Sequence, residues 1–172
     1  MLTQSNTTHK IVPMILSPAE ASNHEIIYTS KSIVTAFGEA GFKTAFFTNQ
    51  KYNGSFPAHY YDAADYKVSL RDKSMWALDH ELLSYLDTLL QTERENNLLI
   101  IMHLYGSHFN YKDRYTDEFA YFLPDKAEYI SVKNKRELIN SYNNSIISTA
   151  DLVAKVIRRI EAQDAESSLL YL

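Results

Sequence analysis

The sequence has no cysteine and only 4 glycines, and both shortages exclude classes of site. Without cysteine, the chain cannot form a disulfide, ligate an iron–sulfur cluster or build a zinc site on thiolates. The few glycines form no glycine-rich phosphate loop. The longest strictly apolar run is 98–102, far short of the ~20 residues that a membrane-spanning helix needs.

Basic residues are also in short supply. There are 17 Lys and Arg against 21 Asp and Glu, which gives a formal net charge of −4. This balance argues against a general nucleic-acid binder, whose surface is normally basic.

Hydrophobic residues make up 45% of the 172 residues, which excludes disorder and fibrous repeats and fits one domain or part of a larger one. Aromatic residues are plentiful, with 13 Tyr and 8 Phe.

Helix-like and strand-like segments alternate along the chain. This order predicts an α/β domain with a mostly parallel sheet flanked by helices. Capping residue types and apolar spacing predict helices at about 5–17, 30–40, 76–92 and 135–162. Short apolar runs predict buried strands at 43–48, 98–104 and 168–172, the second of them central in the sheet. We expect loops at 52–65 and 105–130, the latter long enough to be functional.

Ligands of open parallel sheets bind beyond the carboxyl ends of the strands, and two histidines lie at such a place. His103 and His108 flank the loop after 98–104, where an imidazole can bind a metal or hydrogen-bond an oxyanion. The competing interpretation is a packed core histidine at 103 and a solvated one at 108. Similarly, the hydroxyls at 5–8 suit a phosphate at a helix start, but they are also ordinary capping residues. The residues alone leave both questions open.

Four segments are informative as an ordered set. The first has Thr8 at a helix start, five residues before Pro13, and the second is a strand that ends in Asn-Gln at 49–50. The third is His-Leu-Tyr-Gly-Ser-His at 103–108, followed by Lys112, Arg114 and Tyr115, and the fourth is Asn-Ser-Tyr-Asn-Asn-Ser-Ile at 140–146. Together they resemble the bacterial phosphoethanolamine transferases of the alkaline phosphatase (sulfatase-like) superfamily, which include lipid A modifying and colistin-resistance enzymes.

The resemblance implies an alkaline-phosphatase-like fold and a function. The function is zinc-dependent transfer of phosphoethanolamine from phosphatidylethanolamine to lipid A or another cell-envelope glycan. Thr8 would be the nucleophile, which coordinates zinc and carries the group as a covalent intermediate. His108 matches a residue that binds the substrate phosphate or a zinc ion, and His103 matches the earlier histidine of that loop. Asn49 and Lys51 are the corresponding substrate-binding candidates after 43–48.

The resemblance further implies that 1–172 is part of a single catalytic domain. That domain would face the periplasm and be held at the bacterial inner membrane by a preceding region. An acidic zinc ligand is expected upstream and an Asp-His pair downstream, so most zinc ligands are expected outside this chain and the isolated chain is expected to be inactive. Two alternatives stay open: a phosphodiesterase or sulfatase that delivers the group to water, and a non-catalytic domain that keeps the fold. The sulfatase pattern Cys/Ser-x-Pro-x-Arg is not found around Pro13.

Overall fold

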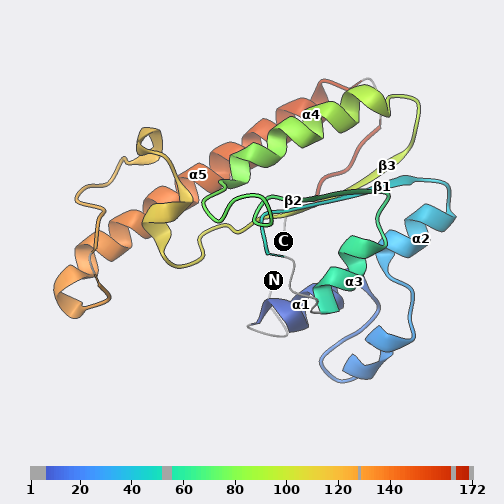
Figure 1. Ribbon diagram of the computed structural model, residues 1–172, viewed down its shortest axis with the longest axis horizontal. Coiled ribbons are helices and arrows are strands. Elements are labelled where there is room, and N and C mark those ends of the chain that lie inside the picture. Colours follow the sequence, from blue (N-terminus) through green and yellow to red (C-terminus); the bar gives the residue numbers. More distant parts are fainter. Residues whose placement is uncertain (1–6, 52–55, 128, 164–165, 171–172) are drawn as a thin grey trace.

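The computed structural model describes residues 7–51, 56–127, 129–163 and 166–170 (Figure 1). The α-helices in these ranges are α1 (Thr8–Leu16), α2 (Ile33–Glu39), α3 (Phe56–Asp62), α4 (Leu82–Thr92) and α5 (Lys135–Glu161). The strands are β1 (Lys43–Thr48), β2 (Tyr66–Ser69) and β3 (Leu98–His103). Short 3-10 helices are η1 (His24–Tyr28), η2 (Asp79–Glu81), η3 (Tyr111–Arg114), η4 (Asp117–Phe119) and η5 (Val132–Asn134).

The described strands form one parallel sheet in the order β2-β1-β3. At the carboxyl end of β1, Thr48 lies opposite Ser69 of β2 and His103 of β3. All three strands therefore deliver their following loops to the same edge of the sheet, which confirms the predicted α/β architecture and its parallel pairing.

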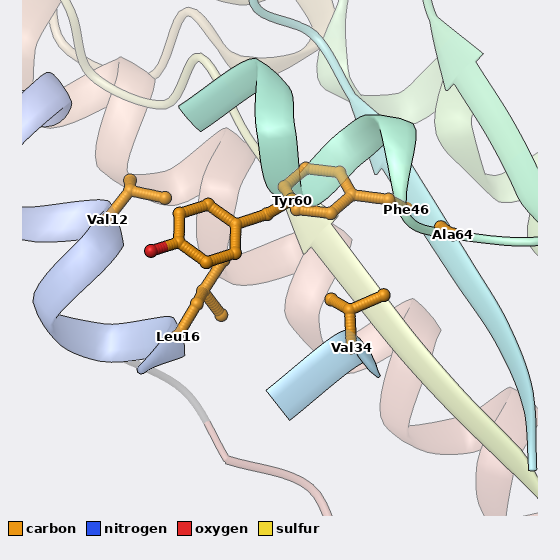
Figure 2. Packing of buried hydrophobic residues seen from close by; sticks show 6 residues of the cluster. All are labelled: Val12, Leu16, Val34, Phe46, Tyr60 and Ala64. Carbon is orange, nitrogen blue, oxygen red and sulfur yellow. The ribbon is translucent and has the colours of Figure 1, made fainter. Parts of the chain in front are cut away.

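Alternate residues of β1 face opposite sides of the sheet, and helices cover both sides. Phe46 faces the side that α1, α2 and α3 cover, below the sheet in Figure 1. Figure 2 shows the residues packed with it, which are Val12, Leu16, Val34, Tyr60 and Ala64. This cluster fixes α1, whose first residue is Thr8, against the sheet.

The opposite face of the sheet packs against α4 and α5 (Figure 1). Ala45 and Phe47 of β1 contact a cluster that includes Leu82 and Leu89 of α4. A neighbouring cluster joins α4 to α5, and its buried members are Leu83, Leu86 and Leu152. The strand-following loops thus emerge between two helical layers.

The expected loop at 52–65 is wrong in part, because α3 occupies Phe56–Asp62. Tyr60, which is 2% exposed, packs against α1 and β1. This burial stabilises a helix that the local sequence does not predict. The short strand β2, at 66–69, was also not predicted. Its residues alternate apolar and polar over only four positions, too few for a clear period.

The strand expected at 98–104 is confirmed as β3, but among the described strands it lies at the edge of the sheet and not at its centre. It pairs with β1 alone among the described strands, and each of its six residues is partly exposed. The strand expected at 168–172 is also wrong for Ser168–Leu170, which form no strand and are exposed, while 171–172 lie outside the described residues.

The helix boundaries follow the sequence predictions within a few residues, with one exception. The helix expected from residue 76 begins only at Leu82, because 79–81 form η2. In the described part of the chain, no helix combines the length and apolarity needed to cross a membrane.

Candidate active site

The loops after β1 and β3 are joined at the sheet edge by hydrogen bonds. The N–H of Asn49 donates to the carbonyl oxygen of His103 at 3.0 Å, which extends the strand pairing by one residue. The Thr48 hydroxyl donates to the same carbonyl at 3.3 Å and lies 3.5 Å from His103 Nδ1. In addition, the Gln50 amide donates to the Leu104 carbonyl at 3.1 Å. The two predicted site loops are therefore neighbours.

Asn49 is buried, with 1% of its surface exposed, and its side chain binds protein groups. Its Nδ2 donates to the carbonyl oxygen of Ala77 at 3.0 Å and to Asp79 Oδ1 at 2.8 Å. Its Oδ1 is buried and accepts no hydrogen bond within the described part of the chain. Asn49 thus links the loop after β1 to the segment that precedes α4.

The imidazole of His103 is half-buried at the end of β3. It contacts the Phe46 ring edge-on at a centroid distance of 6.3 Å. Burial lowers the pKa of His103 below its ordinary value of 6.5, while the negative charge of Asp79 partly opposes that shift. The neutral imidazole is therefore favoured at neutral pH. This environment is that of a packed histidine with one side toward the sheet edge.

His108, in contrast, is exposed on the loop. Its Nδ1 lies 2.9 Å from the carbonyl oxygen of Phe109. Because a carbonyl only accepts hydrogen bonds, Nδ1 carries the proton, and the lone pair of the neutral ring is at Nε2. The ring also packs on Tyr105 at a centroid distance of 4.9 Å. His108 therefore offers one nitrogen that can ligate a metal or accept a proton.

Two arginines lie against the ring of Tyr105. The guanidinium carbon of Arg71 is 3.7 Å from the ring centroid, and that of Arg114 is 4.4 Å from it. Burial, and next the positive charge of Arg71, lower the pKa of Arg114. Positive charge is thus concentrated beside the histidine loop, where it suits an anionic group.

Asp79 is a site-forming residue that sequence reasoning missed. It accepts hydrogen bonds from the Asn49 side chain and from the backbone N–H groups of Tyr105 and Gly106. The sequence offered no signal for it, since Asp79 belongs to no metal-loop spacing and its contacts lie 26 and more residues away.

Residues of α5 hold part of the long segment after β3 in place. Asn144, which is fully buried, bonds both backbone groups of Phe122, and the Asn140 side chain donates to the Pro124 carbonyl. Ser145 donates to Ser107 at 2.9 Å, inside the histidine loop. The Asn-Ser-Tyr-Asn-Asn-Ser motif therefore positions a loop next to the sheet edge.

A buried polar network lies behind that loop. The carboxylate of Asp125 accepts hydrogen bonds from Tyr115 at 2.7 Å, Lys112 at 3.0 Å and Asn144 at 3.3 Å. Burial disfavours the charged carboxylate, but these bonds outweigh that cost and lower the pKa of Asp125. The Lys and Tyr of the third motif thus have a structural role in the described contacts.

Thr8 and Lys51 are exposed. Thr8 is the first residue of α1, and Thr7 before it provides no side-chain cap to that helix. The hydrogen bonds, ion pairs and ring contacts among the described residues join neither Thr8 nor Lys51 to His103, His108 or Asn49. The described residues contain no group of three or more His, Asp or Glu arranged to hold a metal ion. Thr8 Oγ1 and His108 Nε2 are donor types that zinc accepts, so each fits one position of a zinc site.

The chain matches known proteins along its whole length. It matches the Sulfatase family over residues 1–172. It is 26% identical over 179 residues to phosphoethanolamine transferase EptC of Escherichia coli strain RS218, covering 99% of this chain and 31% of that protein. Over 87 residues it is 36% identical to the Kdo(2)-lipid A phosphoethanolamine 7''-transferase of Escherichia coli K12, covering 46% of this chain and 16% of that protein.

The fold is similar to that of a solved relative. The C-terminal periplasmic domain of EptC from Escherichia coli, in complex with Zn, superposes with a TM-score of 0.81 at 24% identity. The match covers 93% of this chain and 47% of that domain, which confirms the alkaline-phosphatase-like fold class. The chain spans less than a third of the length of the two transferases named in the preceding paragraph. Since the family match extends over all 172 residues, this chain belongs to the sulfatase family.

Proposed function

We propose that the whole protein transfers phosphoethanolamine from phosphatidylethanolamine to lipid A or another cell-envelope glycan, with Thr8 as nucleophile. The observation that carries this proposal is the alignment of 99% of the chain with a relative named phosphoethanolamine transferase. A second relative is named for Kdo(2)-lipid A, which supports that class of acceptor. By analogy with the periplasmic domain of EptC, the catalytic domain faces the periplasm from the bacterial inner membrane.

The exposed position of Thr8 supports its role as nucleophile. At the start of α1, its hydroxyl lies beside the positive end of the helix dipole, where the first N–H groups stabilise phosphoryl oxygens. In the first step, Thr8 Oγ1 attacks the phosphorus of the donor. The Oγ1–P bond forms, the bond from phosphorus to the diacylglycerol oxygen breaks, and the hydroxyl proton ends on that oxygen. In the second step, an acceptor oxygen attacks the same phosphorus, the bond between Oγ1 and phosphorus breaks, and the proton released by the acceptor ends on Thr8 Oγ1.

His108 and the arginine pair support binding of the transferred group. The Nε2 lone pair of His108 can accept a proton or occupy a ligand position, while Arg71 and Arg114 provide positive charge nearby. We propose that Lys51 and His103 contribute to phosphate binding. Asn49 would support them by holding the loop after β1 against the end of β3. A bound zinc ion would lower the pKa of the Thr8 hydroxyl and offset charge on the phosphoryl oxygens.

The test uses the full-length protein and its Thr8→Ala, Thr8→Ser and Thr7→Ala variants. Incubation with phosphatidylethanolamine, then peptide mass spectrometry, should show a phosphoethanolamine adduct on Thr8, absent in Thr8→Ala and reduced in Thr8→Ser. Thr7→Ala is the matched control and should keep the adduct. An adduct on Thr7, or turnover that survives in Thr8→Ala, contradicts the assignment.

The same experiment separates the alternatives. Release of free phosphoethanolamine at the same rate with and without lipid A would identify a hydrolase. No adduct and no turnover in the wild-type, zinc-loaded protein would identify a non-catalytic domain.

A further inference from the structure

The carboxylate of Asp79 connects both loops at the sheet edge. Its Oδ1 accepts hydrogen bonds from Asn49 Nδ2 at 2.8 Å and from the Tyr105 N–H at 2.9 Å, and its Oδ2 accepts from the Gly106 N–H at 2.8 Å. Three donors on two oxygens use most of the acceptor capacity of an ionised carboxyl group. The connection also reaches α4, because Asp79 opens η2, which runs directly into that helix.

The loop that Asp79 holds has a backbone that few residues can adopt. Gly106 has a φ of +58°, in the left-handed region, and its N–H points at the Asp79 carboxylate. The turn at Tyr105–Gly106 is therefore fixed by a glycine and by two backbone hydrogen bonds to one side chain. His108 follows two residues later and packs on the Tyr105 ring.

Two arginines lie against the turn that Asp79 holds. The guanidinium groups of Arg71 and Arg114 lie against the ring of Tyr105, the residue whose N–H Asp79 accepts. In the described part of the chain, Arg71 Nε and Nη2 are buried without a hydrogen-bond partner. The negative charge of Asp79 attracts Arg114 and so partly offsets the repulsion that Arg71 exerts on Arg114.

We infer that Asp79 is a positioning residue of the transfer site, whose ionised carboxylate sets the turn that presents His108 and joins it to Asn49. The inference rests on the proposed function. The three hydrogen bonds require an acceptor at both side-chain oxygens of residue 79. In Asp79→Asn, the new NH₂ would face the Gly106 N–H, donor against donor, while the oxygen could keep only the other two contacts. Asp79→Glu keeps the charge but displaces it by one methylene.

Asp65 provides a matched control at the opposite end of the sheet. Its Oδ2 accepts hydrogen bonds from the Thr44 N–H at 2.9 Å and the Thr44 hydroxyl at 3.0 Å, near the amino end of β1. Because a single oxygen accepts both bonds, an asparagine could keep them, so the control is Asp65→Ala, which removes a similar carboxylate–backbone contact far from the histidine loop. Both variants are expected to lower the melting temperature, which makes stability alone uninformative.

The first measurement is amide hydrogen exchange in the full-length protein. Exchange at Gly106 should accelerate about tenfold or more in Asp79→Asn and stay unchanged in Asp65→Ala, and exchange at Thr44 should show the reverse pattern. Equal Gly106 protection in Asp79→Asn and wild type would overturn the inference. This readout does not depend on activity, so it stands even if the wild-type protein forms no adduct on Thr8 and the proposed function fails.

The second measurement is transfer kinetics on the same variants, corrected for folded protein. We expect kcat to fall about tenfold in Asp79→Asn and Asp79→Glu, with KM for phosphatidylethanolamine changed less than about twofold. The reason is that a small displacement of His108 slows the reaction step more than it weakens binding of the substrate. Asp65→Ala should keep kcat. If Gly106 exchange accelerates in Asp79→Asn but kcat stays at the wild-type value, Asp79 holds the loop without serving transfer, and the inference is wrong.

Discussion

The side chain of Asn144 bonds both backbone groups of Phe122. Its Oδ1 accepts from the Phe122 N–H at 2.9 Å, and its Nδ2 donates to the Phe122 carbonyl at 3.0 Å. The buried amide of Asn144 thus satisfies both backbone groups of Phe122, as a neighbouring strand would in a sheet. Through this contact α5 orders a long loop that has little regular structure of its own.

Replacing Asn144 should destabilise the protein strongly. Asn144→Ala leaves the backbone groups of Phe122 unpaired next to a buried cluster, which should cost about 2–4 kcal/mol in the free energy of unfolding. Asn144→Asp keeps the acceptor for the Phe122 N–H, but its second oxygen would replace the Nδ2 that donates to Asp125 at 3.3 Å. We therefore expect Asn144→Asp to be at least as unstable as Asn144→Ala in denaturant unfolding. A stable Asp variant would contradict the network.

The Tyr115 phenol should make stability fall at alkaline pH. Burial, together with the Asp125 carboxylate that accepts its hydrogen bond, raises the pKa of Tyr115 from 10.0 to about 12. The folded protein therefore retains a proton that the unfolded chain loses. The stabilisation is complete below pH 10 and is lost as the pH rises from 10 toward 12.

Unfolding experiments across that pH range can isolate this residue. Tyr115→Phe removes the titrating hydroxyl and should flatten the alkaline loss, although its stability at neutral pH will be lower. Tyr121, which is 70% exposed, supplies the control, and Tyr121→Phe should keep the wild-type pH dependence. If both variants behave like wild type, Tyr115 does not contribute to the alkaline loss.

His108 should affect transfer without affecting folding. Its ring is exposed, so His108→Ala in the full-length protein should lower kcat strongly while the melting temperature changes little. His59, which is exposed on α3, is the control, and His59→Ala should keep the wild-type rate. A large drop in melting temperature with unchanged activity per folded molecule would instead show a structural histidine.

Zinc binding by the 172-residue chain should be weak. The described residues hold no group of three or more His, Asp or Glu suited to a metal ion, and Thr8 with His108 supplies two donors at most. Calorimetry at neutral pH should show no tight site. One tightly bound zinc per chain would show that the residues present suffice to hold the metal.

The sequence predicted those elements whose signal is local and repeated. The five consecutive apolar residues of β3 and the long amphipathic face of α5 belong to this class. The sequence failed to predict elements that depend on contacts with residues far away in the chain. One example is α3, which is stabilised by the burial of Tyr60 against α1 and β1. For the candidate site, the sequence placed His103 at the end of a strand and His108 on the loop that follows, and both lie there in the structure. Asp79 could not be found, because a single aspartate has no local pattern and acquires its role only when three loops converge.

The open edge of β3 has a consequence for handling the chain. Within the described residues, that strand pairs on one side only, and its sequence Leu-Leu-Ile-Ile-Met-His contains no lysine, glutamate or proline to discourage further pairing. Natural sheets usually protect such borders with charge or proline. When this chain is produced alone, its solubility should therefore fall with concentration through intermolecular strand addition, and a lysine introduced at the outward edge of β3 should restore the monomer.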